Sequence, residues 1–171
     1  MLINFSSLSS KESVFTTVAA YLQEQGLRVD KKDESRPWGG FFVIDEADAE
    51  KFIRLYFSHL TIEDLTISGK LSPKILVVAP EKRLSWQYHF RRAEIWKLIG
   101  GVASVVTSNT DEEKDLAELK IGDIIQLKQG ERHRLIGLSG WGIIAEIWRH
   151  TDPSNPSDES DIVRLQDDFG R

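Results

Sequence analysis

The sequence predicts an all-β protein, a closed barrel or jelly roll of antiparallel strands, with a helix ahead of it. Short apolar runs follow one another from Lys74 onwards, and glycines separate them at close intervals. The clearest pattern of helical period lies near the N-terminus instead. Antiparallel strands joined by tight turns commonly close into a barrel, and inward-facing side chains converge at its mouth.

The length and composition fit one soluble globular domain. The chain has 171 residues, of which 40% are hydrophobic and 29% are charged. It has no cysteine, which excludes disulfides and thiolate metal sites. The net charge of −5, without a long run of lysine and arginine, argues against general nucleic-acid binding. No apolar run approaches the roughly 20 residues of a membrane span, and no secretory signal is visible. We therefore expect a cytoplasmic protein that binds neither nucleic acid nor membrane.

The N-terminal segment has the pattern of an amphipathic helix. Ser9 and Glu12 have the spacing of a capping box. Apolar residues then recur every four positions, and Gly26 follows as a stop signal. These features predict a helix over residues 11–25 that packs on the main sheet.

The remaining elements follow from apolar periodicity and from turn residues. A short strand is expected over residues 41–44 and a second helix over residues 47–57. Further strands are predicted over residues 75–79, 85–90, 94–99, 102–107, 122–128, 133–138 and 141–149. The tail over residues 152–168 is rich in Pro, Ser and Asp and is expected to be mostly irregular, wrapping the barrel. We therefore divide the domain into an N-terminal helix with its connector (residues 1–35) and the barrel (residues 36–171).

Side chains that can bind a metal converge in the predicted barrel. Gln87 and His89 are two positions apart, so a strand places them on the same face. Glu94 has the wrong parity for that strand, but a turn after His89 brings it to the same space. His133 reaches the site from a distant segment. Together they offer two oxygens and two imidazole nitrogens, a set that suits zinc first and also manganese, iron or nickel. The alternative is a barrel without a metal, in which these residues form hydrogen bonds with one another.

Two further side chains are candidates for catalysis. Glu146 stands in an apolar run, where burial would raise its pKa towards the range of a general base. Its alternative is a structural ion pair with an arginine, or a place on the outward face. Arg92 has the same parity as Glu94 and Trp96, so it enters the same cavity, where it could orient a phosphate or stabilise negative charge. Its alternative is a solvated arginine in a turn.

Two motifs complete a recognisable signature. The first reads Gln87-x-His89-x4-Glu94-x6-Gly101 and the second reads Gly122-x5-Lys128-x-Gly130-x2-His133. Both spacings resemble those of the cupin superfamily, a small jelly-roll barrel that holds a metal. Further segments resemble the type II phosphomannose isomerases: Arg36-Pro37-Trp38-Gly39, Arg92-Ala93-Glu94-x-Trp96 and Asp161-Ile162-Val163-Arg164. The chain is also similar to small stand-alone cupins catalogued as phosphoheptose isomerases. Among the departures, the family commonly has glycine where Glu81 stands.

The resemblance implies an activity and assigns roles to individual residues. It implies that Gln87, His89, Glu94 and His133 hold a divalent metal, and that Lys74, Arg92 and Arg164 bind the substrate. It implies a metal-dependent aldose–ketose isomerase for mannose-6-phosphate or a related hexose or heptose phosphate. The reaction would pass through an enediolate, with Arg92 and Glu146 as catalytic residues. The alternatives are a non-catalytic cupin that binds a sugar or sugar phosphate, or another metallocupin enzyme. Fold analogy adds the expectation of a homodimer.

Overall fold

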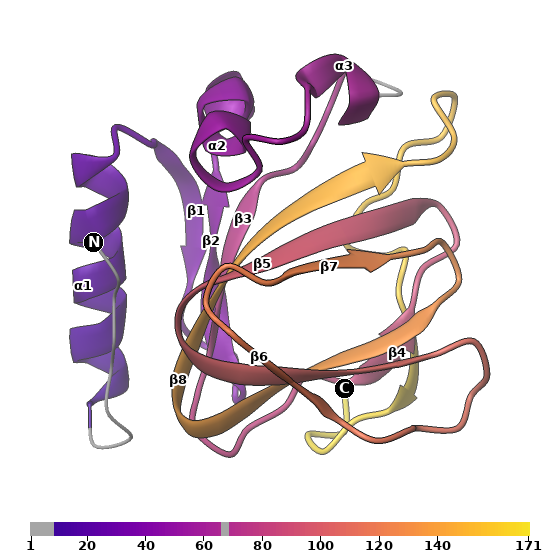
Figure 1. Cartoon of the computed structure of the whole chain (residues 1–171). Coiled ribbons are helices and arrows are strands. Elements are labelled where there is room, and N and C mark those ends of the chain that lie inside the picture. Colours follow the sequence, from indigo (N-terminus) through magenta and orange to yellow (C-terminus); the bar gives the residue numbers. More distant parts are fainter. Residues whose placement is uncertain (1–8, 66–68) are drawn as a thin grey trace.

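The computed structural model describes residues 9–65 and 69–171 and has the all-β architecture that the sequence predicts (Figure 1). Strands curl into a barrel, α1 lies outside one wall, and α2 and α3 lie at one end. The elements in chain order are α1 (Lys11–Glu24), β1 (Val29–Asp33), β2 (Gly39–Ile44), η1 (Glu46–Asp48), α2 (Ala49–Tyr56), α3 (Ile62–Leu65), β3 (Lys74–Val78), β4 (Trp86–Tyr88), β5 (Arg92–Ser108), β6 (Ala117–Leu119), β7 (Ile124–Leu127), β8 (Arg132–His150) and β9 (Val163–Gln166). None of the helices described is long and apolar enough to span a membrane.

The strands form one antiparallel sheet that curls on itself. Neighbouring strands follow the order β1-β2-β3-β8-β4-β9, and β5 pairs with β6, β7 and β8. The long strands β5 and β8 pair along nearly their whole lengths. One half of β8 also pairs with β3, whereas His133 in its other half pairs with Gln87 of β4. A single long strand therefore links the wall behind the helices to the wall that carries the predicted metal ligands.

Alternate residues of the central strands face opposite sides of the sheet. Ile143 and Ile147 of β8 belong to the apolar cluster beneath the helices, whereas Ile144 belongs to a second apolar cluster inside the barrel. Glu146 and Trp148 continue the inward side and line a cavity. The interior thus changes from apolar to polar along the strand, and the candidate site lies at the polar end.

The first helix begins at Lys11, as predicted, but its N-cap is not the residue that the capping box indicated. Ser10, not Ser9, is the N-cap, and its side chain accepts a hydrogen bond of 3.1 Å from the N–H of Ser13. The buried side chains of α1 are Val14, Phe15, Val18 and Leu22, which form a stripe against the sheet. Gly26, with a positive φ of 67°, ends the segment as predicted.

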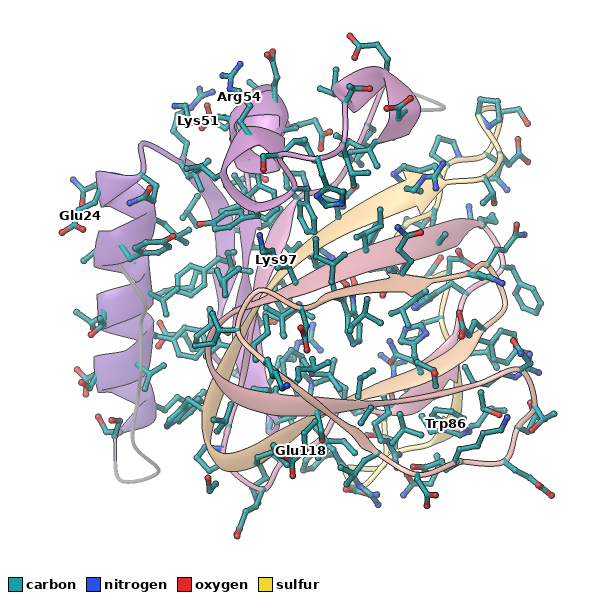
Figure 2. The ribbon with its side chains drawn as sticks, viewed as in Figure 1. Glu24, Lys51, Arg54, Trp86, Lys97 and Glu118 are labelled. Atoms are coloured by element: carbon teal, nitrogen blue, oxygen red, sulfur yellow. The ribbon has the colours of Figure 1, made fainter. Side chains whose placement is uncertain are left out.

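The second helix also packs on the outside of the barrel. Phe52 of α2 is fully buried and lies edge-on to Tyr56, with ring centroids 4.8 Å apart. Lys97 reaches up from β5 and donates a hydrogen bond of 2.8 Å to the carbonyl of Tyr56 (Figure 2). Figure 2 shows Lys51 and Arg54 on the other side of α2, where they point away from the barrel. The predicted amphipathic helix over residues 47–57 is thereby confirmed.

Several strand boundaries differ from those predicted. Residues 94–99 and 102–107 form one strand, β5, and residues 133–138 and 141–149 form another, β8. The glycines between these runs mark irregularities within long strands, not separate turns. Gly101 has a φ of 70°, and a Cβ added there would lie 1.8 Å from the carbonyl oxygen of Trp141, so only glycine fits.

Three short strands fall in segments where the sequence predicts no strand. The polar residues 29–33 form β1, which pairs with β2, and β6 pairs with β5. The tail over residues 152–168 is mostly irregular, as predicted, except that residues 163–166 form β9 beside β4. β1 and β6 pair with strands that are near in the sequence, whereas β9 is held by a strand about 75 positions earlier, with Tyr88 opposite Val163. Polar composition therefore misled the prediction where a partner strand supplied the hydrogen bonds.

Candidate metal centre and the cavity beside it

A tight turn between β4 and β5 brings the predicted ligands together. The carboxylate of Asp161, from the C-terminal tail, accepts hydrogen bonds of 3.0 and 2.9 Å from the backbone N–H groups of Phe90 and Arg91. This clamp reverses the chain between His89 and Glu94, as the parity of the sequence requires. The tail thus takes part in shaping the site instead of only covering the barrel.

His89, Glu94 and His133 form a compact and buried cluster. One ligand atom from each lies within 4.8 Å of the others. Nε2 of His89 is 3.2 Å from Glu94 Oε1, and Nε2 of His133 is 3.4 Å from Glu94 Oε2. Each of the three residues is at most 2% exposed. The residues predicted from sequence spacing therefore meet at one point inside the barrel.

The imidazole rings present their Nε2 atoms to the centre of this cluster. Nδ1 of His89 faces the carbonyl of Asp161 at 2.5 Å, and Nδ1 of His133 faces the carbonyl of Glu131 at 2.9 Å. A backbone carbonyl requires a donor, so each Nδ1 carries a proton, and in the neutral form of the ring the Nε2 atom keeps a lone pair that faces Glu94. Nε2 of His133 is buried and makes no hydrogen bond among the described residues. An orphaned nitrogen lone pair beside a carboxylate is the arrangement that a divalent cation satisfies.

Gln87 completes the set from the neighbouring strand. It is the cross-strand partner of His133 and lines the same cavity as Glu94. Its side-chain oxygen accepts a hydrogen bond of 2.5 Å from the hydroxyl of Ser85, which fixes the orientation of the amide. The amide oxygen can thus serve as a further neutral ligand, and all four predicted ligand residues lie in one region.

Arg92 is buried in the site and contacts the cluster directly. Its Nε donates a hydrogen bond of 2.7 Å to Glu94 Oε1, and its Nη2 lies 3.2 Å from Nε2 of His89. The same guanidinium donates to the hydroxyl of Ser157 and to the carbonyl of Asp158 in the tail, at 2.9 and 3.0 Å. The side chain is therefore an inward-facing arginine, as its parity predicts, and it links the cluster to the tail.

The two buried carboxylates have opposite pKa shifts. Burial alone would raise the pKa of Glu94, but His89 and Arg92 outweigh it and hold that pKa well below its ordinary value. Burial, reinforced by the negative charge of Glu94, raises the pKa of Glu146 to about 8. Trp96 connects them, because its Nε1–H lies 3.1 Å from Glu94 Oε2 and 3.0 Å from Glu146 Oε1. Glu94 is thus suited to binding a cation, and Glu146 to exchanging a proton near neutral pH.

A cavity of about 100 Å³ lies beside this cluster. Its polar lining comes from Arg36, Lys74, Ser85, Gln87, Arg92, Glu94, Glu146, Glu159, Arg164 and Arg171, and its aromatic lining from Trp38, Phe41, Trp96 and Trp148. Lys74 is the cross-strand neighbour of Glu146, and Arg164 is the cross-strand neighbour of Gln87. The cavity is thus lined by the residues predicted to bind the substrate and to exchange the proton, and by two of the predicted metal ligands, Gln87 and Glu94. The other two ligands, His89 and His133, contact Glu94 but do not line the cavity.

Sequence reasoning missed several residues that shape the site. Glu159 forms an ion pair with Lys74, and Asp161 clamps the turn between β4 and β5. Trp148 lines the cavity and has the Arg92 guanidinium 3.7 Å from its ring centroid. The similarity of residues 161–164 to the isomerase family was a signal for part of the tail. The polar composition around Glu159 gave no such signal, because most charged loop residues are simply solvated.

The other two histidines, His59 and His150, stand outside the site. His150 is buried, and its Nδ1 accepts a hydrogen bond of 2.9 Å from the backbone N–H of Ser157. Its role is therefore to hold the tail against the barrel. His59 is exposed at the end of α2.

Comparison with known proteins places the chain in a family. The family model for the C-terminal part of mannose-6-phosphate isomerase matches residues 55–167. No match was found among curated proteins. Among solved structures, the chain is similar to CapF, the capsular polysaccharide assembling protein from Staphylococcus aureus, with a TM-score of 0.52 and 12% identity over 82% of this chain. It is also similar to procruciferin, an 11S globulin from Brassica napus, with a TM-score of 0.53 and 15% identity over 81% of this chain.

A third similar structure is a recombinant oxalate oxidase in complex with glycolate, with a TM-score of 0.51 and 16% identity over 78% of this chain. The chain spans 34% of CapF, 31% of procruciferin and 58% of the oxidase. Identities this low show a shared fold and carry nothing about activity. The family match covers most of the barrel, all four candidate metal ligands, and Lys74, Glu146 and Arg164 of the cavity. The chain therefore has a cupin fold and belongs to the mannose-6-phosphate isomerase C-terminal family.

Proposed function

We propose that the chain is a metal-dependent isomerase that interconverts an aldose phosphate and a ketose phosphate. The observation that carries this proposal is the pairing of two buried carboxylates with opposite pKa shifts, Glu94 within a His–Glu–His cluster and Glu146 beside the cavity. One is suited to binding a cation and the other to moving a proton. Family membership supports mannose-6-phosphate or a related hexose or heptose phosphate as the substrate.

Residues of β4, of the turn that follows it, of β5 and of β8 would hold the metal. They are Gln87, His89, Glu94 and His133, which offer an amide oxygen, a carboxylate and the Nε2 atoms of both histidines. Burial lowers the pKa of His89 despite the attraction of Glu94, which favours the neutral ring that a metal ligand requires. Zinc suits this set first, followed by manganese, iron and nickel. When bound, a divalent cation supplies Lewis acidity that polarises the substrate carbonyl.

Glu146 is the proposed general base. Isomerisation removes a proton from the carbon next to the carbonyl and returns a proton to the former carbonyl carbon. A carboxylate with a pKa of about 8 can take up that proton and give it back near neutral pH. Trp96 holds Glu146 in place through its hydrogen bond of 3.0 Å, so the carboxylate faces the cavity in one orientation.

Positively charged side chains around the cavity serve the rest of the substrate. Arg92 is buried beside Glu94 and would stabilise negative charge that develops in the enediolate. Lys74 and Arg164 line the same cavity and would bind the phosphate. No described carboxylate forms an ion pair with Arg164, so its charge is available to an anion at the mouth.

The first test is elemental analysis of the purified protein. We expect about one divalent metal per chain and its loss in His133→Ala, because His133 supplies a buried ligand nitrogen. His59→Ala is the matched control, since His59 is exposed and distant from the cluster in the sequence. A wild-type protein that takes up no zinc or manganese after reconstitution would refute the metal centre.

The second test is proton exchange during turnover. The metal-loaded protein is incubated in D₂O with mannose-6-phosphate and then with related aldose and ketose phosphates. Deuterium at the carbon next to the carbonyl, detected by NMR, is the expected result. Glu146→Gln should abolish this exchange while keeping the metal.

One contact favours a second candidate, a cupin that binds a sugar phosphate without transforming it. Nη2 of Arg92 lies 3.2 Å from Nε2 of His89 and can satisfy that nitrogen without a metal. A non-catalytic protein of this kind would bind sugar phosphates but show no exchange in D₂O. The same pair of experiments therefore separates the two functions.

A further inference from the structure

We propose that Lys74 and Trp148 form the subsite for the anionic group of the ligand, and that Glu159 of the tail occupies this subsite as an internal competitor. This inference rests on the proposed function for the identity of the ligand, a phosphate monoester. It adds a residue, Glu159, that the ligand must displace. The Lys74–Glu159 ion pair would then block the subsite until the phosphate of the ligand displaces Glu159.

The surroundings of Lys74 favour the binding of an anion. Its side chain is 8% exposed, and its Nζ lies 4.0 Å from the ring centroid of Trp148 and 5.6 Å from that of Phe41. A buried ammonium group needs a negative partner. Its cross-strand neighbour Glu146 makes its hydrogen bond with Trp96, so Glu159 is the carboxylate that pairs with Lys74. Aromatic rings around a cation hold it in place without neutralising it.

Glu159 is held only by its ion pair with Lys74 in the described part of the chain. Its side chain is 71% exposed, and within residues 9–65 and 69–171 it makes no hydrogen bond or ion pair except with Lys74. The neighbouring tail residues are anchored separately, because Ser157 binds Arg92 and Asp161 clamps the turn after β4. The Glu159 side chain can therefore swing into solvent while the tail stays in place.

The ion pair stands between two cavities. The cavity at the metal centre holds about 100 Å³, and a neighbouring cavity holds about 440 Å³. Both are lined by Arg36, Phe41, Lys74, Trp148 and Glu159. Typical ligand pockets measure about 300–1,000 Å³, so the inner cavity alone is too small for a sugar phosphate. Displacement of Glu159 would join the inner cavity to the larger one and make room for the ligand.

Trp148 adds an unused donor at the same wall. Its side chain is 4% exposed, and its indole Nε1–H is buried without a hydrogen-bond partner in the described part of the chain. A buried indole N–H normally finds an acceptor. A phosphate oxygen that replaces the Glu159 carboxylate on Lys74 would lie beside the same ring. The ammonium and the indole N–H together thus favour a ligand with several acceptor oxygens.

Charge favours the exchange as well. The larger cavity is lined by Lys31, Arg36, Lys70 and Lys74 and by Asp30, Glu46, Asp158 and Glu159. The carboxylate of Glu46 already accepts hydrogen bonds from the backbone N–H groups of Leu71 and Ser72. Withdrawal of Glu159 leaves the lining with an excess of positive charge next to Lys74, which an incoming phosphate dianion neutralises.

The test is calorimetric binding of inorganic phosphate to the full-length protein. If the ion pair forms about nine-tenths of the time, Glu159→Gln should bind phosphate about tenfold more tightly than wild type. Lys74→Met should bind it far more weakly than either. Asp152→Asn is the control, because it removes one negative charge from the same tail without contacting Lys74, and its affinity should equal that of wild type. Each titration is run with zinc bound and again after chelation, which separates phosphate on the metal from phosphate on Lys74.

The proposal is overturned if Glu159→Gln binds phosphate no more tightly than wild type and Asp152→Asn. It is also overturned if a folded Lys74→Met keeps wild-type affinity after chelation. Should Lys74→Met fail to fold, the comparison of Glu159→Gln with Asp152→Asn still decides. These measurements need no turnover, so they are independent of the isomerase proposal. If the affinities are as expected but no exchange occurs in D₂O, the anion subsite is supported and the isomerase is rejected. If exchange occurs but the affinities do not change as expected, the isomerase is supported and the subsite is rejected.

Discussion

The two faces of strand β8 are both buried, but they carry different kinds of side chain. On the outward face, Ile143 and Ile147 are fully buried beneath α1 and α2. On the inward face, Glu146 and Trp148 are nearly as buried but stand beside the cavity. Apolar burial on the outward face stabilises the fold. A buried carboxylate on the inward face costs stability unless it is paired or protonated.

This difference shows how the barrel can tolerate a charged interior. The cluster beneath the helices joins α1 and α2 to β2, β3 and β8 and is continuous. The charged groups at the site, Lys74, Arg92, Glu94 and Glu146, are all buried within reach of opposite charges. We therefore expect substitutions on the helix-covered face to affect stability, and substitutions of the charged groups on the inward face to affect the proposed chemistry. Substitutions on the two faces should separate stability from activity.

The largest effect is expected from Glu146→Gln on the inward face. Loss of a general base should lower kcat/KM for a sugar phosphate by about 10²–10⁴-fold, because glutamine cannot accept the substrate proton. The metal content should be unchanged. Glu118→Gln is the control, since Glu118 is exposed on β6 (Figure 2). Activity within twofold of wild type in Glu146→Gln would remove this residue from the mechanism.

Substitution of the neighbouring residue on the outward face should reduce stability and leave the metal site intact. Ile147→Ala should lower the free energy of unfolding by about 2–5 kcal/mol, because it leaves a cavity in a fully packed cluster. Denaturant titration measures this loss, and the folded variant should still bind its metal in full stoichiometry. Leu55→Ala is the control, because Leu55 is 40% exposed and should change stability by roughly 0.5 kcal/mol or less. Loss of the metal from folded Ile147→Ala would mean that the faces are not independent.

The pH dependence of stability should single out the inward face. Because the pKa of Glu146 rises from 4.5 to about 8 on folding, its protonated form is favoured in the folded state. Its contribution is present in full below pH 4.5, declines as the pH rises, and is lost above about pH 8. The stability of metal-free wild type relative to Glu146→Gln should therefore fall by about 2 kcal/mol between pH 5 and pH 7. Equal pH profiles for the two proteins would show that the carboxylate is not buried as described.

The smallest effect is expected outside both faces, in the turn between β3 and β4. Glu81 has a φ of 57°, a left-handed conformation that favours glycine, and it is exposed. Glu81→Gly should therefore stabilise the protein by about 0.5–1 kcal/mol, as seen in a higher Tm. Lys82→Gly, at the next position and without a positive φ, should destabilise by a similar amount. Activity should change in neither variant.

Local spacing was enough to predict the centre of the site. The parity of Gln87, His89 and Glu94 required a turn, and the structure has it at Phe90 and Arg91. The same parity placed Arg92 and Trp96 beside Glu94, where both contact its carboxylate. Glu146 stood out as an acidic residue in an apolar run, and it lies in the cavity. These predictions succeeded because alternation along a strand is a local property of the backbone.

The sequence by itself therefore determined the β class, the helix ahead of the barrel and the side chains that meet in its interior. Only the tertiary structure decided that β5 and β8 are long continuous strands, that β1 and β9 exist, and that the tail clamps the turn after His89. It alone placed Glu159 on Lys74, a pair separated by 85 positions in the chain. The physical reason is that strand pairing and the burial of a charge depend on partners distant in sequence, whereas periodicity reports only which residues share a face.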